Sequence, residues 1–250
     1  MNPEALTQLA QTVAIYALPV LFAITLHEAA HGYVARHFGD LTAHAQGRIS
    51  LNPARHIDWI GTVAVPLAIL LLTAGKFIFG WAKPVPVNYS ALRRPRQHMA
   101  WVAAAGPGAN LVMAVLWAVV LRAGVAMSDR GGAWAEVAQV YGTGGLVDAA
   151  IRHGNGPSEY LIGVAAAGIL VNLLLMLLNL LPIPPLDGGR IVTSLLPRRA
   201  AWRFAKLEPL GVPLLLLLVF LPVYGSNPLS LILGPLLLES EALVRAMVRL

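Results

Sequence analysis

The sequence predicts an all-α polytopic membrane protein with about five to six transmembrane segments and one re-entrant extended or β segment. Composition is the first observation: apolar residues make up 57% of the chain and charged residues 12%, whereas a soluble domain carries about a quarter charged residues. The second is a mean hydropathy of +0.68. The third is a series of uncharged runs long enough to cross a bilayer, since about 20 apolar residues span its hydrocarbon core as a helix.

Five apolar runs account for the expected spans. The first covers residues 12–26 and continues as a helical pattern to about His37. The others cover residues 59–75, 99–121, 160–186 and 209–238. Prolines interrupt the last run, so it forms either one span with an interfacial piece or two tilted pieces. We expect a single membrane domain over residues 1–250, with its core at 12–206 and hydrophobic C-terminal helices at 207–250.

Two stretches depart from this helical pattern. Residues 80–88 alternate prolines with apolar residues, which excludes a helix interior and favours an extended segment. Residues 131–156 are rich in glycine and mixed in polarity. This composition is compatible with a short amphipathic helix near residues 133–140, lying outside the bilayer, and leaves the fold of 131–156 otherwise open.

The basic residues predict an orientation in the membrane. Lys and Arg number 18 against 12 Asp and Glu, and they gather at residues 36–55, 76–96 and 190–206. If residues 77–88 dip back into the membrane, all three clusters lie on the cytoplasmic side of the inner (plasma) membrane, as the positive-inside rule favours. The dipping segment must then line an internal cavity, because lipid cannot satisfy non-helical backbone.

Composition also excludes several classes of function. The chain has no Cys, which excludes disulfides, thiol catalysis and cysteine-bound metal. No basic run is interleaved with aromatic residues, so we expect no nucleic-acid partner. A cleavable signal peptide begins with positive charge, but no Lys or Arg precedes the first apolar run. We therefore expect this run to stay in the chain.

Polar residues in the first span carry the clearest chemical signal. His27-Glu28-Ala29-Ala30-His31 places two histidines at i and i+4, one turn apart on one helical face. Two imidazoles at this spacing can bind one zinc ion, and the adjacent Glu28 can act as general base toward water. Polar residues reaching lipid headgroups at a helix end are the alternative. It is disfavoured because these groups are costly in hydrocarbon unless they pair or bind metal.

A catalytic zinc site needs a third protein ligand. Prolines end the fourth apolar run just before Asp187, and Gly188 and Gly189 after it allow close backbone approach. A carboxylate on unwound backbone at membrane depth suits a buried ion site, whereas a solvated helix end is the alternative. The candidates are the remaining glutamates and the aspartates Asp40, Asp58, Asp129, Asp148 and Asp187.

The pairing of His27-Glu28-Ala29-Ala30-His31 with Asn-Leu-Leu-Pro-Ile-Pro-Pro-Leu-Asp-Gly-Gly-Arg at 179–190 resembles the site-2 protease family of intramembrane zinc metalloproteases. Residues 47–53 resemble a stretch common in bacterial members, and residues 105–110 resemble the family's Gly-Pro-x-x-Asn element. The resemblance covers about residues 26–190. It indicates a compact bacterial-type member without an inserted PDZ domain.

The resemblance implies roles for individual residues. His27, His31 and Asp187 would bind one zinc ion (Zn²⁺), and Glu28 would be the general base and then the acid for the leaving amine. Asn179 occupies the position of a family Asn that holds the substrate or the tetrahedral oxyanion, although a helix-capping or interhelical hydrogen bond is its alternative. Asn110 is a weaker candidate for the same role.

The function expected from these observations is an intramembrane zinc metalloendopeptidase with its active site toward the cytoplasmic side. It would hydrolyse peptide bonds within or near transmembrane segments of membrane-protein substrates, in regulated intramembrane proteolysis, and residues 77–87 would pair with the substrate as a strand. One alternative is a catalytically silent membrane scaffold of protease ancestry that binds transmembrane segments, which the intact Glu28 disfavours. The other is a metal transporter, disfavoured because the polar residues converge on one site.

Overall fold

The computed structural model describes residues 3–72, 80, 82–154, 156–223 and 225–249. Within them the chain is largely helical, with no strand and one isolated bridge between Val223 and Ser226. The elements in chain order are α1 (Pro3–His37), α2 (Thr42–Ala45), η1 (Pro53–Arg55), η2 (Trp59–Ala64), α3 (Val65–Leu72), η3 (Tyr89–Ala91), α4 (Pro95–Met127), α5 (Gly131–His153), α6 (Pro157–Leu180), α7 (Asp187–Leu195), α8 (Arg198–Ala205), α9 (Glu208–Phe220) and α10 (Pro228–Met247).

Three helices in the described part are long and apolar enough to cross a membrane: Leu6–His37 within α1, α4 and α6. Shorter apolar helices cover Trp59–Ile69 and Glu208–Phe220. This agrees with the expected helical membrane class. The number of spans and the re-entrant segment stay predictions.

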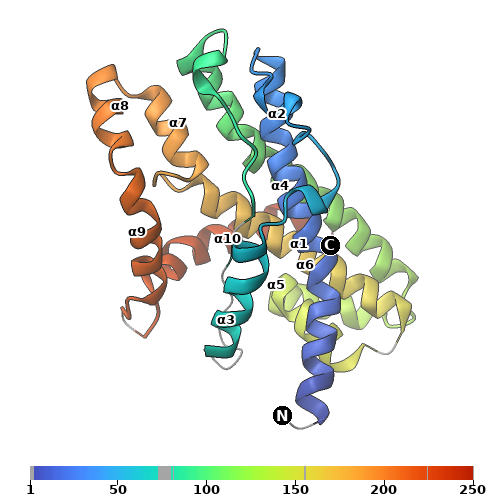
Figure 1. The fold of residues 1–250 in the computed structure, drawn as a ribbon. Coiled ribbons are helices and arrows are strands. Elements are labelled where there is room, and N and C mark those ends of the chain that lie inside the picture. Colours follow the sequence, from blue (N-terminus) through green and yellow to red (C-terminus); the bar gives the residue numbers. More distant parts are fainter. Residues whose placement is uncertain (1–2, 73–79, 81, 155, 224, 250) are drawn as a thin grey trace.

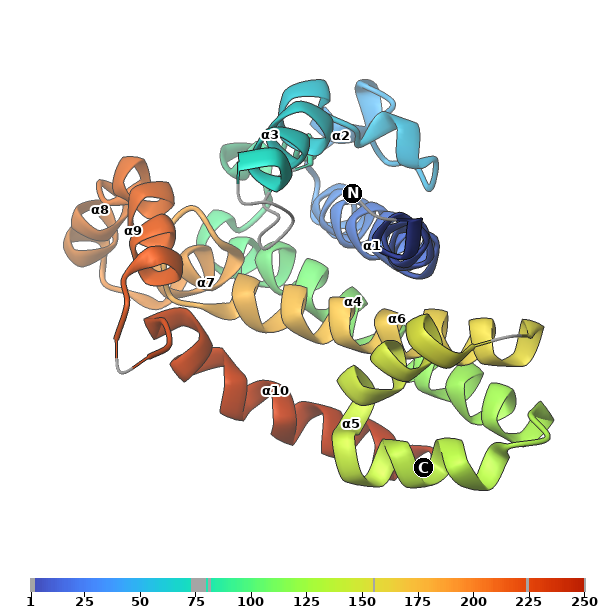
Figure 2. The same cartoon turned by 90° about the horizontal axis from the view of Figure 1, so that it is seen from below.

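Helices α1, α4 and α6 pack against one another around the core of the molecule (Figures 1 and 2). Small residues permit this close packing, as is typical between membrane helices. α6 buries Gly163, Gly168 and three consecutive alanines, 165–167. Trp117 of α4 lies over Gly168, where an added Cβ would meet the indole ring at 2.4 Å.

The stretch at 131–156 is more helical than its composition suggests. Helical structure covers Gly131–His153, in two pieces joined at Gly142, whose φ is +66°. The short helix at 133–140 is thus present, and helix also forms in the rest of the stretch, whose fold the sequence left open. Trp134, Leu146 and Val147 are buried in the same core cluster as residues of α4 and α6, and such packing outweighs the low helix propensity of glycine.

The ends of two apolar runs are also settled by the structure. α6 stops at Leu180, and a turn through 181–186 precedes α7, in line with the prolines of that stretch. The last apolar run forms two helices, α9 and α10, separated at residues 221–227. The prolines of this run therefore divide it into two helices, and which of them crosses the membrane stays a prediction.

Candidate metal centre

α1 positions the two histidines of the first span. His27 and His31 lie one turn apart on its buried face, with exposed fractions of 8% and 9%. Their rings meet edge to face at 4.7 Å between centroids. The two Nε2 atoms are 3.1 Å apart, so both imidazoles point toward the same small volume.

α7 delivers a carboxylate to that volume. Asp187 is the first residue of α7, and its Oδ2 lies 3.3 Å from Nε2 of His27 and 3.3 Å from Nε2 of His31. Glycine is needed beside it because an added Cβ at Gly188 would lie 2.2 Å from the Leu180 carbonyl oxygen. The chain can therefore reverse from α6 into α7 and bring Asp187 against α1.

Hydrogen bonds on the outer side of each imidazole set its orientation. Nδ1 of His27 donates to Oδ1 of Asn110 at 2.5 Å, and Nδ1 of His31 donates to the Val102 carbonyl at 2.6 Å. With Nδ1 as the donor, Nε2 carries the free lone pair that a metal requires. Asn110 is held in turn by Asn172, to whose Oδ1 its Nδ2 donates at 2.9 Å.

Three observations indicate that the cluster fits a metal ion. The Oδ2 of Asp187 is buried without a hydrogen bond in the described structure. Two imidazole nitrogens and one carboxylate oxygen are a donor set that zinc takes. Zinc bonds of about 2.0–2.1 Å in a tetrahedral site put ligand atoms about 3.3 Å apart, and the separations here are 3.1–3.3 Å.

A glycine of α4 leaves room over the imidazoles. A Cβ added at Gly106 would lie 2.4 Å from Nε2 of His31 and 2.6 Å from Nε2 of His27. Any side chain there would occupy the volume on which the two nitrogens converge. Gly106 belongs to the stretch 105–110 that the sequence singled out, and its position beside the cluster gives that stretch a steric role.

Glu28 is half-buried on α1, beside the cluster. Its Oε2 accepts a hydrogen bond from the Val85 amide at 2.7 Å. Val85 belongs to residues 82–88, here called the 82–88 segment, which is neither helix nor strand and runs between α3 and α4 (Figure 1). Part of the expected extended stretch, residues 77–79 and 81, lies outside the described residues.

Two side chains that sequence reasoning did not assign hold the 82–88 segment in place. Asp40, with an exposed fraction of 1%, accepts the Asn88 amide at 2.7 Å. Arg48 donates to the carbonyl oxygens of Lys83 at 2.9 Å and Pro84 at 3.3 Å. The only sequence signal for Arg48 was its place in residues 47–53, which resemble a stretch of bacterial family members. Nothing in the sequence indicated that Asp40 would bind this segment.

The other candidates lie elsewhere in the described structure. Asn179 donates from Nδ2 to the Leu175 carbonyl at 3.0 Å in the last turn of α6, and no described contact joins it to the cluster. Asp58 caps η2 through the amides of Ile60 and Gly61. Asp148 pairs with Arg152 at 2.9 Å. Asp187 is thus the carboxylate that joins the two histidines in the described metal-type cluster.

Comparison with known proteins adds independent findings. The model of peptidase family M50 matches residues 15–221. A Bacillus subtilis (strain 168) protein named "Putative zinc metalloprotease YwhC" is 36% identical over 220 residues, which cover 88% of this chain and 84% of that protein. A Mycolicibacterium smegmatis protein named "Putative zinc metalloprotease Rip2" is 29% identical over 168 residues, 67% of this chain and 52% of that protein. No solved structure matches.

Proposed function

The chain belongs to peptidase family M50, the site-2 proteases, and on this premise we propose that it is an intramembrane zinc metalloprotease. It hydrolyses peptide bonds within or near transmembrane segments of membrane-protein substrates. The observation that carries the proposal is the buried cluster of His27, His31 and Asp187, whose ligand atoms lie within 4.8 Å of one another, next to Glu28.

In this proposal His27, His31 and Asp187 hold the zinc ion. When bound, zinc lowers the pKa of a coordinated water to about 7 and polarises the scissile carbonyl. Glu28 takes the proton of the attacking water and then delivers it to the leaving amine. The hydrogen bond from the Val85 amide fixes the carboxylate of Glu28 for this task, which makes Val85 a positioning residue.

The 82–88 segment gives the substrate a partner for its exposed backbone. A substrate helix must unwind before attack, and its freed amide and carbonyl groups need new hydrogen bonds at membrane depth. Pairing with an extended segment supplies them. Pro84 and Pro86 have no N–H, so they offer only carbonyl oxygens to a partner strand. Asn179, by the resemblance to the family, holds the substrate or the oxyanion.

A cavity beside the turn that carries Asp187 supports access of water from one end of the molecule. Its volume is about 380 Å³. Its lining includes residues just before Asp187, Pro184 and Pro185, and residues just after it, Gly189 and Arg190. The Arg190 guanidinium donates to the Tyr89 hydroxyl at this cavity. Burial raises the pKa of Tyr89, with Arg190 acting in the opposite direction, so the phenol stays a neutral hydrogen-bonding group near pH 7.

We further propose that this end faces the cytoplasm and that the protein resides in the inner membrane. The end of α1, the start of α4 and α8 lie at one end of the molecule (Figure 1). These elements carry basic residues of all three clusters, including Arg36, Arg96 and Arg198. Lys and Arg are enriched in cytoplasmic loops, which supports this orientation.

The test is cleavage by the full chain and by Glu28→Gln, both in proteoliposomes with a panel of single-span peptides. The proposal predicts product from the wild type and a loss of about 10²–10⁴-fold in Glu28→Gln, with zinc content unchanged. Glu136→Gln, in α5, is the matched control and should cleave normally. Peptides that bind both proteins without any cleavage would instead support a silent scaffold.

A further inference from the structure

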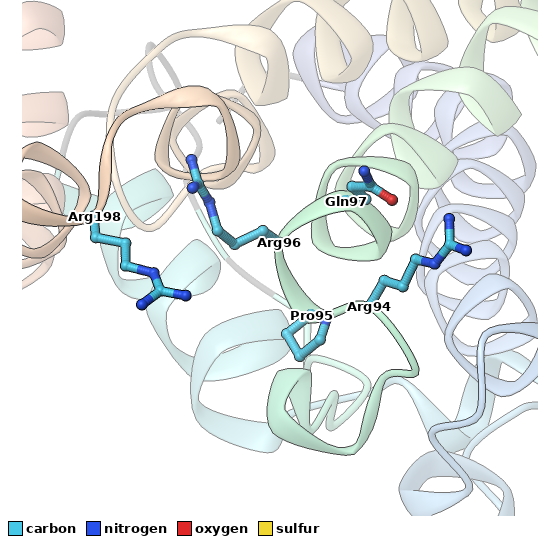
Figure 3. Close-up of a pocket in the computed structure, with 5 residues that line it drawn as sticks. All are labelled: Arg94, Pro95, Arg96, Gln97 and Arg198. Atoms are coloured by element: carbon cyan, nitrogen blue, oxygen red, sulfur yellow. The ribbon is translucent and has the colours of Figure 1, made fainter.

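A shallow basic cavity, wide open on one side, lies outside the proposed metal centre, where α4 and α8 begin. Its volume is about 490 Å³ and its lining residues are Arg94, Pro95, Arg96, Gln97 and Arg198. Figure 3 shows Arg198 reaching from α8 toward the start of α4, where Arg96 extends toward it, and Arg94 on the other side of Pro95. The lining therefore has three guanidinium groups and no carboxylate.

The positive charge of this cavity is not neutralised within the described residues. The side chains of Arg94 and Arg198 form no hydrogen bond and no ion pair there, and both residues are exposed. Arg96 donates to the carbonyl oxygens of Ser194, at 3.2 Å, and Leu196. These carbonyls hold Arg96 in place but leave its charge uncompensated. An anion bound between the arginines would lower their mutual repulsion.

The surroundings favour a lipid as the source of that anion. Three large apolar side chains near the cavity are mostly exposed: Trp101 at 65%, Trp202 at 63% and Leu195 at 74%. Tryptophan is enriched where a protein meets the membrane–water interface. Arg96 and Arg94 precede Trp101 by five and seven residues. At a rise of about 1.5 Å per residue they lie about 7.5 to 10 Å from the level of Trp101, toward the start of α4.

α8 has the composition of a helix that lies along the interface. Its sequence, Arg-Arg-Ala-Ala-Trp-Arg-Phe-Ala, combines three arginines with the aromatic residues Trp202 and Phe204. Lys206 places its ammonium 3.4 Å from the centroid of the Trp202 ring. A basic helix with exposed aromatic residues binds anionic lipid by combining charge attraction with apolar burial. A free anion would use only the charge.

We propose that this cavity binds the phosphate of an anionic phospholipid headgroup. Arg94 and Arg198 contribute guanidinium groups without a partner in the described residues, and Arg96 contributes one that two carbonyl oxygens hold in place. The acyl chains extend along the exposed apolar side chains near Trp101 and Leu195. The site is separate from the metal cluster, since its lining shares no residue with it. Its existence does not depend on proteolytic activity.

The experiment measures phosphatidylglycerol bound to the purified full chain by native mass spectrometry, after extraction from phosphatidylcholine bilayers that contain a minor fraction of phosphatidylglycerol. Arg94→Gln/Arg198→Gln should bind it about 30-fold more weakly, because each of the two basic side chains contributes about 1 kcal/mol at an anionic surface. Arg94→Lys/Arg198→Lys should keep most of the binding. Unchanged thermal unfolding establishes that both variants are folded.

Arg130→Gln/Arg249→Gln is the matched control, because it removes two exposed arginines near the opposite end of α4. It should bind phosphatidylglycerol as the wild type does. An equal loss in both Gln pairs, or no loss in either, would overturn the site. Competition with inorganic phosphate separates the two possible sources of the anion: displacement at matched concentration would assign the cavity to a free anion and overturn the lipid.

Discussion

At the scale of residues, the geometry of the proposed metal centre depends on groups outside its three ligands. Asn110 is fully buried and uses both ends of its amide, accepting from Nδ1 of His27 and donating to Asn172. Asn172 then donates from Nδ2 to the Gly168 carbonyl at 2.8 Å. This chain of hydrogen bonds fixes the ring of His27, so Asn110 acts as a positioning residue in this account rather than through the substrate.

Replacing Asn110 tests this role. In Asn110→Leu the zinc affinity should fall about 10–100-fold, the usual effect of losing such a partner of a metal-bound histidine. Asn110→Asp keeps an acceptor for Nδ1 and should retain most of the affinity. Zinc titration of the apoprotein by competition with a chelator measures both. An Asn110→Leu variant with normal zinc affinity and lost cleavage would instead indicate the substrate or oxyanion role expected from the resemblance.

At the scale of elements, the 82–88 segment donates hydrogen bonds to two carboxylates: Glu28, the proposed general base, and Asp40, which holds the segment in place. Its Val85 amide reaches Glu28 and its Asn88 amide reaches Asp40, so the two hydrogen bonds lie at different points along the segment. A further bond joins the Lys83 amide to the His56 carbonyl at 2.9 Å. The segment therefore has a defined path although no strand forms in the described chain.

Val85→Pro removes the backbone N–H that donates a hydrogen bond to Glu28. It keeps an extended backbone. We expect a loss of kcat of about 10–100-fold with zinc content unchanged, because one hydrogen bond to a charged group contributes about 1.5–3 kcal/mol. Val85→Ala, which keeps the amide, is the control and should cleave near the wild-type rate. A Val85→Pro variant as active as Val85→Ala would show that this hydrogen bond does not position the base.

At the scale of the whole molecule, the sequence anticipated what depends on local pattern. The i, i+4 spacing placed His27 and His31 on one face, and the prolines at 182–185 predicted the end of α6. Among contacts between distant residues, that of Asp187 with the two histidines was expected from the family resemblance. The hydrogen bonds that hold the site had no such signal. The bond from His27 to Asn110 spans 83 positions, and that from Asp40 to Asn88 spans 48. Most of the helix of residues 131–153 also escaped prediction, because packing against the core overrides its glycine content.

The central claim is that His27, His31 and Asp187 form one zinc site, and zinc content tests it most directly. Metal analysis of the purified full chain should give about one zinc per chain. Asp187→Ala should lose most of it, because breaking a three-ligand set sharply lowers affinity, whereas Asp148→Ala, which removes an exposed paired carboxylate, should keep it. Zinc content in Asp187→Ala equal to the wild type, or no zinc in a folded wild type, would contradict the account.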